Sequence, residues 1–194
     1  MISSTEVIPA MLVFEEMDGK PLYYKGYRQV LDNKKSLEDI LGSSFIQALI
    51  VSIVGSYIKG LLKGKDYWVI SNEAGLHLSP GNNLANDIAV FDKALIKDVF
   101  SESYANVPPK IAVEVDSKIE AEHIANPTDY VFLKSDKLIE FGTERVIWIL
   151  TGSRKILVTD QSRKWTIHEW HEFIPLFDGL EICLNDLLKE EGVI

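Results

Sequence analysis

A short apolar strand that carries two acids is predicted at Ile111-Ala112-Val113-Glu114-Val115-Asp116. Alternate residues of a strand point to the same face, so Glu114 and Asp116 are expected to share one side. Burying carboxylates is costly unless a cation or hydrogen-bond donors compensate, so this pair indicates a metal ion or a lysine partner. Asp87 opens a second apolar strand, Ile88-Ala89-Val90-Phe91, and has a similar placement.

A helix is predicted to follow these strands, from an Asn-Pro pair at 126–127 to Gly142 as its C-cap. Both Lys134 and Lys137 fall within its apolar arc, and a lysine aimed at the core needs an anionic partner. Carboxylates and a lysine brought together can bind a divalent ion and activate water for phosphodiester hydrolysis, and they can equally form structural ion pairs. The apolar arc consists of Tyr130, Leu133, Leu138 and Phe141.

The rest of the chain favours an α/β sheet with helices packed against it. The Asp-Gly pair at 18–19 is typical of a tight turn between two extended pieces within Met11–Tyr24. Apolar residues at helical spacing predict a core helix from Lys34 to Lys63. Further strands are predicted at Tyr67–Ser71, Asp87–Phe91, Arg145–Leu150, Ile156–Thr159 and Trp165–Glu169, and a last short helix is predicted at Asp186–Glu191.

Composition and charge indicate one globular domain over residues 1–194, ending in a short acidic tail at about 171–194. The 194 residues carry a formal net charge of −9, which argues against a protein that coats nucleic acid through bulk electrostatics. Basic and acidic residues number 10 and 13 in residues 1–109, 9 and 10 in 110–170, and 1 and 6 in 171–194. More than half of the excess negative charge therefore lies in the tail.

Cysteine content and apolar runs indicate a cytoplasmic protein. The only cysteine of the sequence, Cys183, excludes an internal disulfide framework and a cysteine-based zinc site. Residues 1–10 lack the basic and apolar pattern of a secretory signal. The most apolar run, Phe45–Ile58, is shorter than the roughly 20 residues that a membrane-spanning helix requires. No membrane association is expected.

The order of motifs along residues 11–160 resembles the Uma2 family, a branch of the PD-(D/E)XK nuclease superfamily. Each motif is short, and their order is the specific part. The motifs are Phe14-Glu15-Glu16-Met17-Asp18-Gly19, Asn86-Asp87-Ile88-Ala89-Val90, Ile111-Ala112-Val113-Glu114-Val115-Asp116-Ser117, the lysine-bearing helix ending in Gly142, and Val146-Ile147-Trp148-Ile149.

The resemblance implies a restriction-endonuclease-like mixed sheet flanked by helices, and an endonuclease that hydrolyses DNA with Mg²⁺, for which Mn²⁺ can substitute. It places the metal ligands at Asp87 and Glu114, with the Val115 carbonyl as a further ligand. Glu15 completes or holds the metal site. The family lysine falls on Lys134 when counted back from Gly142, and an alignment with one more residue makes it Lys137. A homodimer is expected, because nucleases that cut both strands commonly pair two sites by two-fold symmetry.

Two positions depart from the family pattern. Asn86 replaces the proline of the Pro-Asp pair, which affects backbone restraint more than chemistry. Asp116 stands where the parent superfamily has its lysine, so it either adds a metal ligand or marks a site that no longer cleaves. The alternative function is a non-catalytic binding or assembly protein that keeps the nuclease fold and uses these charges as structural ion pairs.

Overall fold

The computed structural model describes residues 8–116, 119–120, 124 and 126–194. Within these residues nine strands form one mixed sheet, ordered β6-β2-β1-β4-β5-β7-β8-β9, with β3 paired to β4 outside this path; β10 and β11 form a separate ribbon. The strands are β1 (Val13–Met17), β2 (Lys20–Tyr24), β3 (Tyr67–Ser79), β4 (Asn82–Asp92), β5 (Ile111–Val115), β6 (Ile119–Glu120), β7 (Arg145–Leu150), β8 (Lys155–Asp160), β9 (Thr166–Glu169), β10 (Ile174–Pro175) and β11 (Glu181–Ile182).

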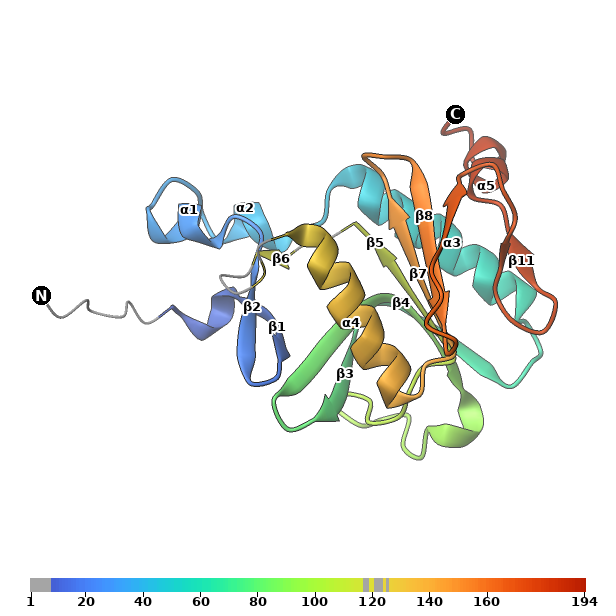
Figure 1. Ribbon diagram of the computed structural model, residues 1–194, viewed down its shortest axis with the longest axis horizontal. Helices are drawn as coiled ribbons and strands as arrows, with labels where there is room; N and C mark the ends of the chain where they lie inside the picture. The colour runs from blue at the N-terminus through green and yellow to red at the C-terminus, as the bar shows by residue number, and fades with distance from the viewer. Residues whose placement is uncertain (1–7, 117–118, 121–123, 125) are drawn as a thin grey trace, which may run out of the picture.

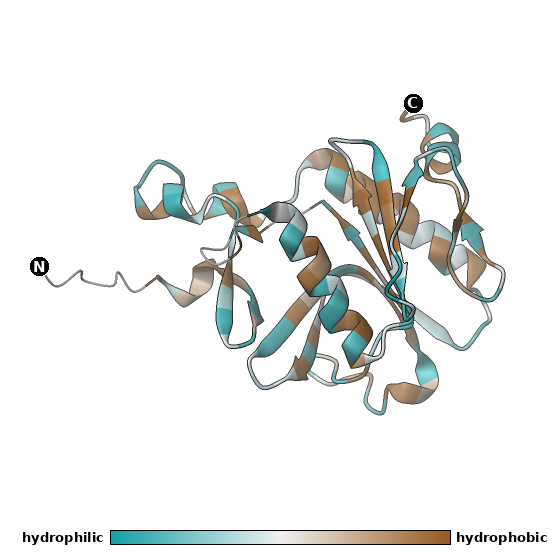
Figure 2. Ribbon diagram, in the orientation of Figure 1, coloured by the Kyte–Doolittle hydropathy of each residue, from teal (hydrophilic) through white to brown (hydrophobic). Residues whose placement is uncertain are grey.

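Two long helices cover opposite faces of the central strands, as Figure 1 shows for α3 and α4. Apolar residues run along those strands, which are largely brown in Figure 2, and they pack against apolar residues of the two helices. The helices are α1 (Tyr27–Leu31), α2 (Glu38–Leu41), α3 (Phe45–Leu61), α4 (Pro127–Phe141) and α5 (Leu184–Glu190), with short 3-10 turns η1 (Ala10–Leu12) and η2 (Lys93–Leu95). The structure therefore confirms the α/β class and the mixed sheet flanked by helices.

Strand β5 sits at the centre of this arrangement and is buried along its whole length. It pairs antiparallel with β4 and parallel with β7. Parallel neighbours need a crossover connection, and α4 supplies it between β5 and β7. Ile111, Val113 and Val115 pack with α3, while Ala112 packs in the cluster on the α4 side. Glu114, two residues after Ala112, therefore faces α4.

The ends of α4 agree with the sequence prediction. The Asn126 side chain accepts a hydrogen bond from the Thr128 N–H at the start of the helix. Gly142 ends it with a φ of 118°, and the N–H of Thr143 bonds back to the Leu138 carbonyl in the manner of a Schellman motif. A Cβ at Gly142 would lie 3.1 Å from Pro108 Cγ, so glycine is required both by the backbone and by the neighbour.

The predicted Asp-Gly turn is confirmed, and it is clasped to a second turn. Asp18 and Gly19 both have positive φ and join β1 to β2. The Gly19 N–H donates to the Gly81 carbonyl in the β3–β4 turn, and the Asp18 N–H donates to Asn82 Oδ1. The two hairpins are thus fixed to each other at their tips.

Several predicted boundaries were wrong. The helix expected over 34–63 is interrupted at residues 42–44, because Ser44 caps a new helix by accepting from the Gln47 N–H. The strands expected at 67–71 and 87–91 belong to one long hairpin, β3–β4, and form its open end, away from the connecting turn. Leu133, predicted to belong to the apolar arc of α4, is 46% exposed.

The C-terminal segment, expected to be an acidic tail, packs against the α3 side of the core. Most of its apolar side chains face inward, and its acids remain on the outside. The buried members are Ile174, Leu176, Ile182, Leu184, Leu187 and Leu188. Among the described residues, no helix combines the length and the apolar character needed to cross a bilayer.

Candidate functional site

Asp87 and Glu114 lie on neighbouring strands and face the same side of the sheet. Ile88 pairs with Val113, so Asp87 stands beside Glu114 just beyond the last paired residues of β4 and β5. Asp87 follows the alternation of Ala89 and Phe91, whose side chains pack on the α4 side. Both carboxyl groups are buried, and Asp87 Oδ2 accepts from the Val115 N–H at 2.8 Å.

Strand β3 is irregular where it passes this point. Its pairing with β4 shifts between Ser71 and Ala74, and the two residues in between, Asn72 and Glu73, have positive φ. An inserted bulge bends a strand and increases its twist, and bulges are common beside functional sites. The β3 bulge lies opposite Asp87, because Ser71 before it pairs with Ile88 and Ala74 after it pairs with Asn86.

Lys134 brings its ammonium to the same place from α4. The residue is 1% exposed. Its Nζ donates to Glu15 Oε1 at 2.8 Å and to the Ala85 carbonyl at 2.6 Å, and it lies 3.1 Å from Glu114 Oε2. An ammonium has three N–H donors, so all three have an acceptor. Lys134 is therefore joined to three different strands: β1, β4 and β5.

Glu15 holds the Lys134 ammonium in place. Besides the lysine, Glu15 Oε1 accepts from the Ala85 N–H at 3.0 Å, and Oε2 accepts from the Tyr130 hydroxyl at 2.7 Å. Of the two roles expected for this residue, its contacts fit the holding role. Burial raises the pKa of Tyr130 well above its usual value, and the nearby Glu15 and Glu114 raise it further, so its hydroxyl keeps its proton and donates.

Lys137 lies outside this cluster. Its Nζ pairs with Asp18 Oδ1 in the β1–β2 turn, where both side chains are partly exposed. Only Lys134, of the two lysines that the sequence left open, contacts Glu114 and Glu15. The spacing of eight residues back from Gly142 was the alignment that identified it.

Asp116 was wrongly predicted to share the face of Glu114. Strand β5 ends at Val115, and Asp116 adopts a positive φ of 56°, which breaks the alternation. Its Oδ1 accepts from the Thr151 N–H at 2.8 Å and its Oδ2 from the Thr151 hydroxyl. Asp116 therefore links the end of β5 to the β7–β8 turn, and both of its carboxylate oxygens accept hydrogen bonds from Thr151.

The Val115 carbonyl is reached by a residue that sequence reasoning missed. Gln47, on the first turn of α3, is buried, and its Nε2 donates to this oxygen. A signal was available: Gln47 belongs to the same helical stripe as the buried Ile50 and Val54, where a polar residue needs a partner. Gln47 and Asp87 together hold both backbone groups of Val115.

Asn86, which the motif comparison predicted to affect backbone restraint more than chemistry, places a second polar side chain in the cluster. Its side chain is fully buried, and its Nδ2 donates to Glu114 Oε1. Its Oδ1 has no hydrogen-bond partner among the described residues. Buried polar atoms are nearly always paired in proteins, so this oxygen is an acceptor that a bound group could use.

The charges of the cluster do not balance. The cluster holds the carboxyl groups of Glu15, Asp87 and Glu114 and one ammonium, that of Lys134, which contacts Glu15 and Glu114. The fully ionised set therefore carries three negative charges against one positive. Burial raises the pKa of Glu114 to about 8; Lys134 opposes this, and Asp87 and Glu15 add to it. Burial lowers the pKa of Lys134, but Glu114 and Glu15 outweigh it, so this pKa lies above its usual value.

A divalent cation fits this imbalance and this set of donors. The described residues contain no group of three histidine, cysteine or acidic side chains arranged to hold a metal. Mg²⁺ does not require such a group, because it is commonly bound through one or two carboxylates with water completing its shell. Asp87, Glu114, the Val115 carbonyl and the unpaired Asn86 Oδ1 are all oxygen donors of the kind that hard cations prefer.

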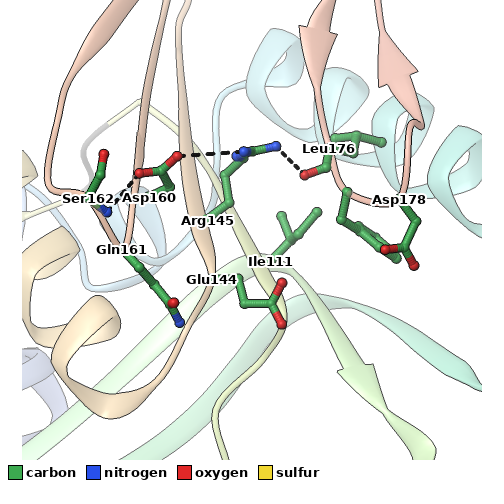
Figure 3. Close-up of a pocket in the computed structure, with 9 residues that line it drawn as sticks. Ile111, Glu144, Arg145, Asp160, Gln161, Ser162, Leu176 and Asp178 are labelled. Carbon is green, nitrogen blue, oxygen red and sulfur yellow. Dashed lines mark hydrogen bonds and ion pairs between the residues drawn. The ribbon is translucent and has the colours of Figure 1, made fainter.

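Two cavities lie outside the cluster. A groove of about 630 Å³ borders Glu15 and Ala85 and continues past Phe14, Asn83 and Tyr104, so it reaches the edge of the cluster. Another, of about 480 Å³, is shown in Figure 3 at the start of β5 and β7. There Arg145 already lies between Asp160 and the Leu176 carbonyl, and the proposed ligands do not line this second cavity.

Comparison with known proteins identifies the fold. No family model matches the sequence, and no curated protein matches it. Among solved structures, the chain is similar to a crystal structure described as "a putative nuclease belonging to DUF820" from Anabaena variabilis ATCC 29413. The TM-score is 0.63 and the identity 16%, over 90% of this chain and 89% of that chain. DUF820 is the Uma2 family. The chain thus has the restriction-endonuclease-like fold of that family, as its motifs predicted.

Proposed function

We propose that this protein is a Mg²⁺-dependent endonuclease that hydrolyses phosphodiester bonds in DNA. The observation that carries the proposal is the buried grouping of Glu15, Asp87, Glu114 and Lys134, which when fully ionised has three negative charges against one positive. These are the residues that the motif resemblance assigns to metal binding and water activation. The fold agrees with this chemistry but does not by itself establish it.

Asp87 and Glu114 would hold the cation, with the Val115 carbonyl beside them. When bound, Mg²⁺ supplies positive charge to the phosphate oxygens and lowers the pKa of a bound water. Glu114 must be ionised to bind a cation, so binding displaces the proton that its pKa of about 8 retains near neutrality. Cation affinity is therefore expected to rise with pH up to about that value.

Lys134 would act on the attacking water and the phosphate. Its three donors are all occupied without a cation. If Glu114 were engaged as a cation ligand, the Lys134 N–H that faces it would become available, while Glu15 and the Ala85 carbonyl would still hold the ammonium. The released donor can orient the water or stabilise charge that develops on the phosphate.

Cleavage of supercoiled plasmid DNA with Mg²⁺ or Mn²⁺ tests this proposal. Low salt is needed, because a protein of net charge −9 binds DNA weakly once its few favourable contacts are screened. Glu114→Gln should abolish cleavage and Lys134→Met should reduce it strongly. Matched controls are Glu144→Gln, which removes an exposed acid paired with Lys110, and Lys137→Met. Equal activity in Glu114→Gln and wild type would exclude the mechanism.

The alternative is a binding or assembly protein in which the same charges are structural. The complete pairing of the Lys134 ammonium favours this candidate, because a buried lysine with three acceptors is satisfied without any ligand. Melting temperature measured against Mn²⁺ concentration separates the two. A nuclease site gains about 2.7 kcal/mol at 100 times its Kd, whereas the alternative predicts no change.

The remaining expectations belong to this proposal as well. A homodimer would allow two sites to cut both strands of a duplex, and a cytoplasmic location would bring the protein to its DNA substrate. The molecular mass in solution, measured by light scattering with and without a DNA duplex, tests the dimer.

A further inference from the structure

Asn86 carries an unexplained acceptor inside the site. Its side chain is 0% exposed, and its oxygen has no partner in the described part of the chain. Leaving a buried polar atom unpaired is costly, so an unpaired atom needs a specific explanation. The nitrogen of the same amide is occupied, since it donates to Glu114 Oε1.

The amide is tied to both proposed cation ligands. Asn86 precedes Asp87 directly in β4, and it contacts Glu114 of β5 through its Nδ2. An amide oxygen is a normal ligand for hard divalent cations and a good acceptor for the water they carry. We propose that Asn86 Oδ1 is a further oxygen donor to the divalent cation held by Asp87 and Glu114. This inference rests on the cation site of the proposed function.

This donor is a property of the present chain. The family that the motifs resemble has proline at this position, and proline has no polar side-chain atom to offer. In this chain asparagine therefore stands where the family has proline, so a residue that restrains only the backbone gives way to one with a side-chain oxygen. The competing explanation is local: Asn86 only restrains the Glu114 carboxylate through its N–H₂ group, and its oxygen has no role.

Asparagine, alanine and aspartate at position 86 separate the two explanations. Alanine removes the oxygen and the N–H₂ group, whereas aspartate keeps an oxygen in place and replaces the N–H₂ group with a second oxygen that carries negative charge. If the oxygen binds the cation, Asn86→Ala should weaken Mn²⁺ binding by about 10-fold, and Asn86→Asp should bind at least as tightly as wild type. If Asn86 only restrains Glu114, both variants should lose affinity together.

The measurement is calorimetric titration of each folded protein with Mn²⁺ alone at pH 8. Asn83→Ala is the matched control, because Asn83 lies in the same strand and bonds to Glu16, outside the cluster. It should leave the Mn²⁺ affinity unchanged. Circular dichroism and melting temperature establish that each variant is folded. If Asn86→Ala fails to fold, Asn86→Asp alone decides, since a loss of affinity in that variant contradicts the proposal.

The outcomes also separate this inference from the proposed function. If wild type binds Mn²⁺, Glu114→Gln loses this binding and Asn86→Ala does not, the proposed cation site stands. The role of Asn86 is then excluded. Parallel losses in Asn86→Ala and Asn86→Asp exclude this role as well. Wild type that does not bind Mn²⁺ at all removes the proposed cation site, and the role of Asn86 is removed with it.

Discussion

Replacing Glu114 with glutamine should change how the stability of the protein depends on pH. The pKa of Glu114 rises from its reference value of 4.5 to about 8 in the folded state, with burial as the main cause. In the unfolded chain the carboxyl group ionises at its ordinary value. Above pH 4.5 the folded state therefore holds a proton that the unfolded state has released, and wild-type stability falls as pH rises towards 8.

The size of the effect follows from this shift. At about 1.4 kcal/mol per pKa unit, ionising Glu114 inside the folded protein costs about 5 kcal/mol in total. The stability that the protonated Glu114 contributes to the folded state is fully present below pH 4.5 and is lost by pH 8. Between pH 5.5 and 8.5, a range that avoids the sequence pI of about 4.9, roughly 3 kcal/mol of it should disappear.

Urea unfolding of wild type and Glu114→Gln across this range measures the difference. Other groups titrate in both proteins, so they cancel when one free energy of unfolding is subtracted from the other. Wild type should lose about 3 kcal/mol relative to the variant between pH 5.5 and 8.5, and saturating Ca²⁺ at pH 8.5 should restore stability in wild type only. Parallel curves for the two proteins, with or without Ca²⁺, would refute the reasoning.

The remaining predictions concern helix α4, through the ion pairs of its two lysines and the glycine at its C-terminal end. Lys134→Met should destabilise the protein by about 3–5 kcal/mol at pH 7, because it leaves the buried Glu15 carboxyl group without the ammonium that it pairs with. Lys137→Met should cost only about 0–1 kcal/mol, since its side chain is 25% exposed and its partner more so; urea unfolding that gave equal losses would contradict this contrast. Gly142→Ala should lower stability by about 1–3 kcal/mol, from the positive φ and the contact with Pro108, and thermal melting checks it.

Local signals in the sequence were enough to predict the helix that carries the lysine. Its first turn is marked by Asn126 and Pro127, and its last by Gly142, and each has the backbone geometry that its residue type favours. The Asp18-Gly19 turn was predictable for the same reason. Counting back from Gly142 along the family motif favoured Lys134, but both lysines fall within the predicted apolar arc, so Lys137 stayed open until the contacts were known.

The errors arose where distant parts of the chain decide the local structure. Asp116 follows the strand pattern in sequence, but its contacts with Thr151 end the strand one residue earlier. Gln47 looked like an interruption in an apolar run, because its partner, the Val115 carbonyl, lies 68 residues away. Periodicity describes neighbours along one element, and it carries no information about a hydrogen bond between two elements.

The pairing of Glu15 with Lys134 joins the first strand of the sheet to the second long helix, 119 residues later. During synthesis at about 5–20 residues per second, Glu15 would wait for about 6–24 s before its lysine is made. Throughout this interval the acid can remain hydrated, and the site cannot close early on an incomplete chain. Ribosome-bound chains halted before and after residue 134 should therefore differ sharply in how well β1 resists protease.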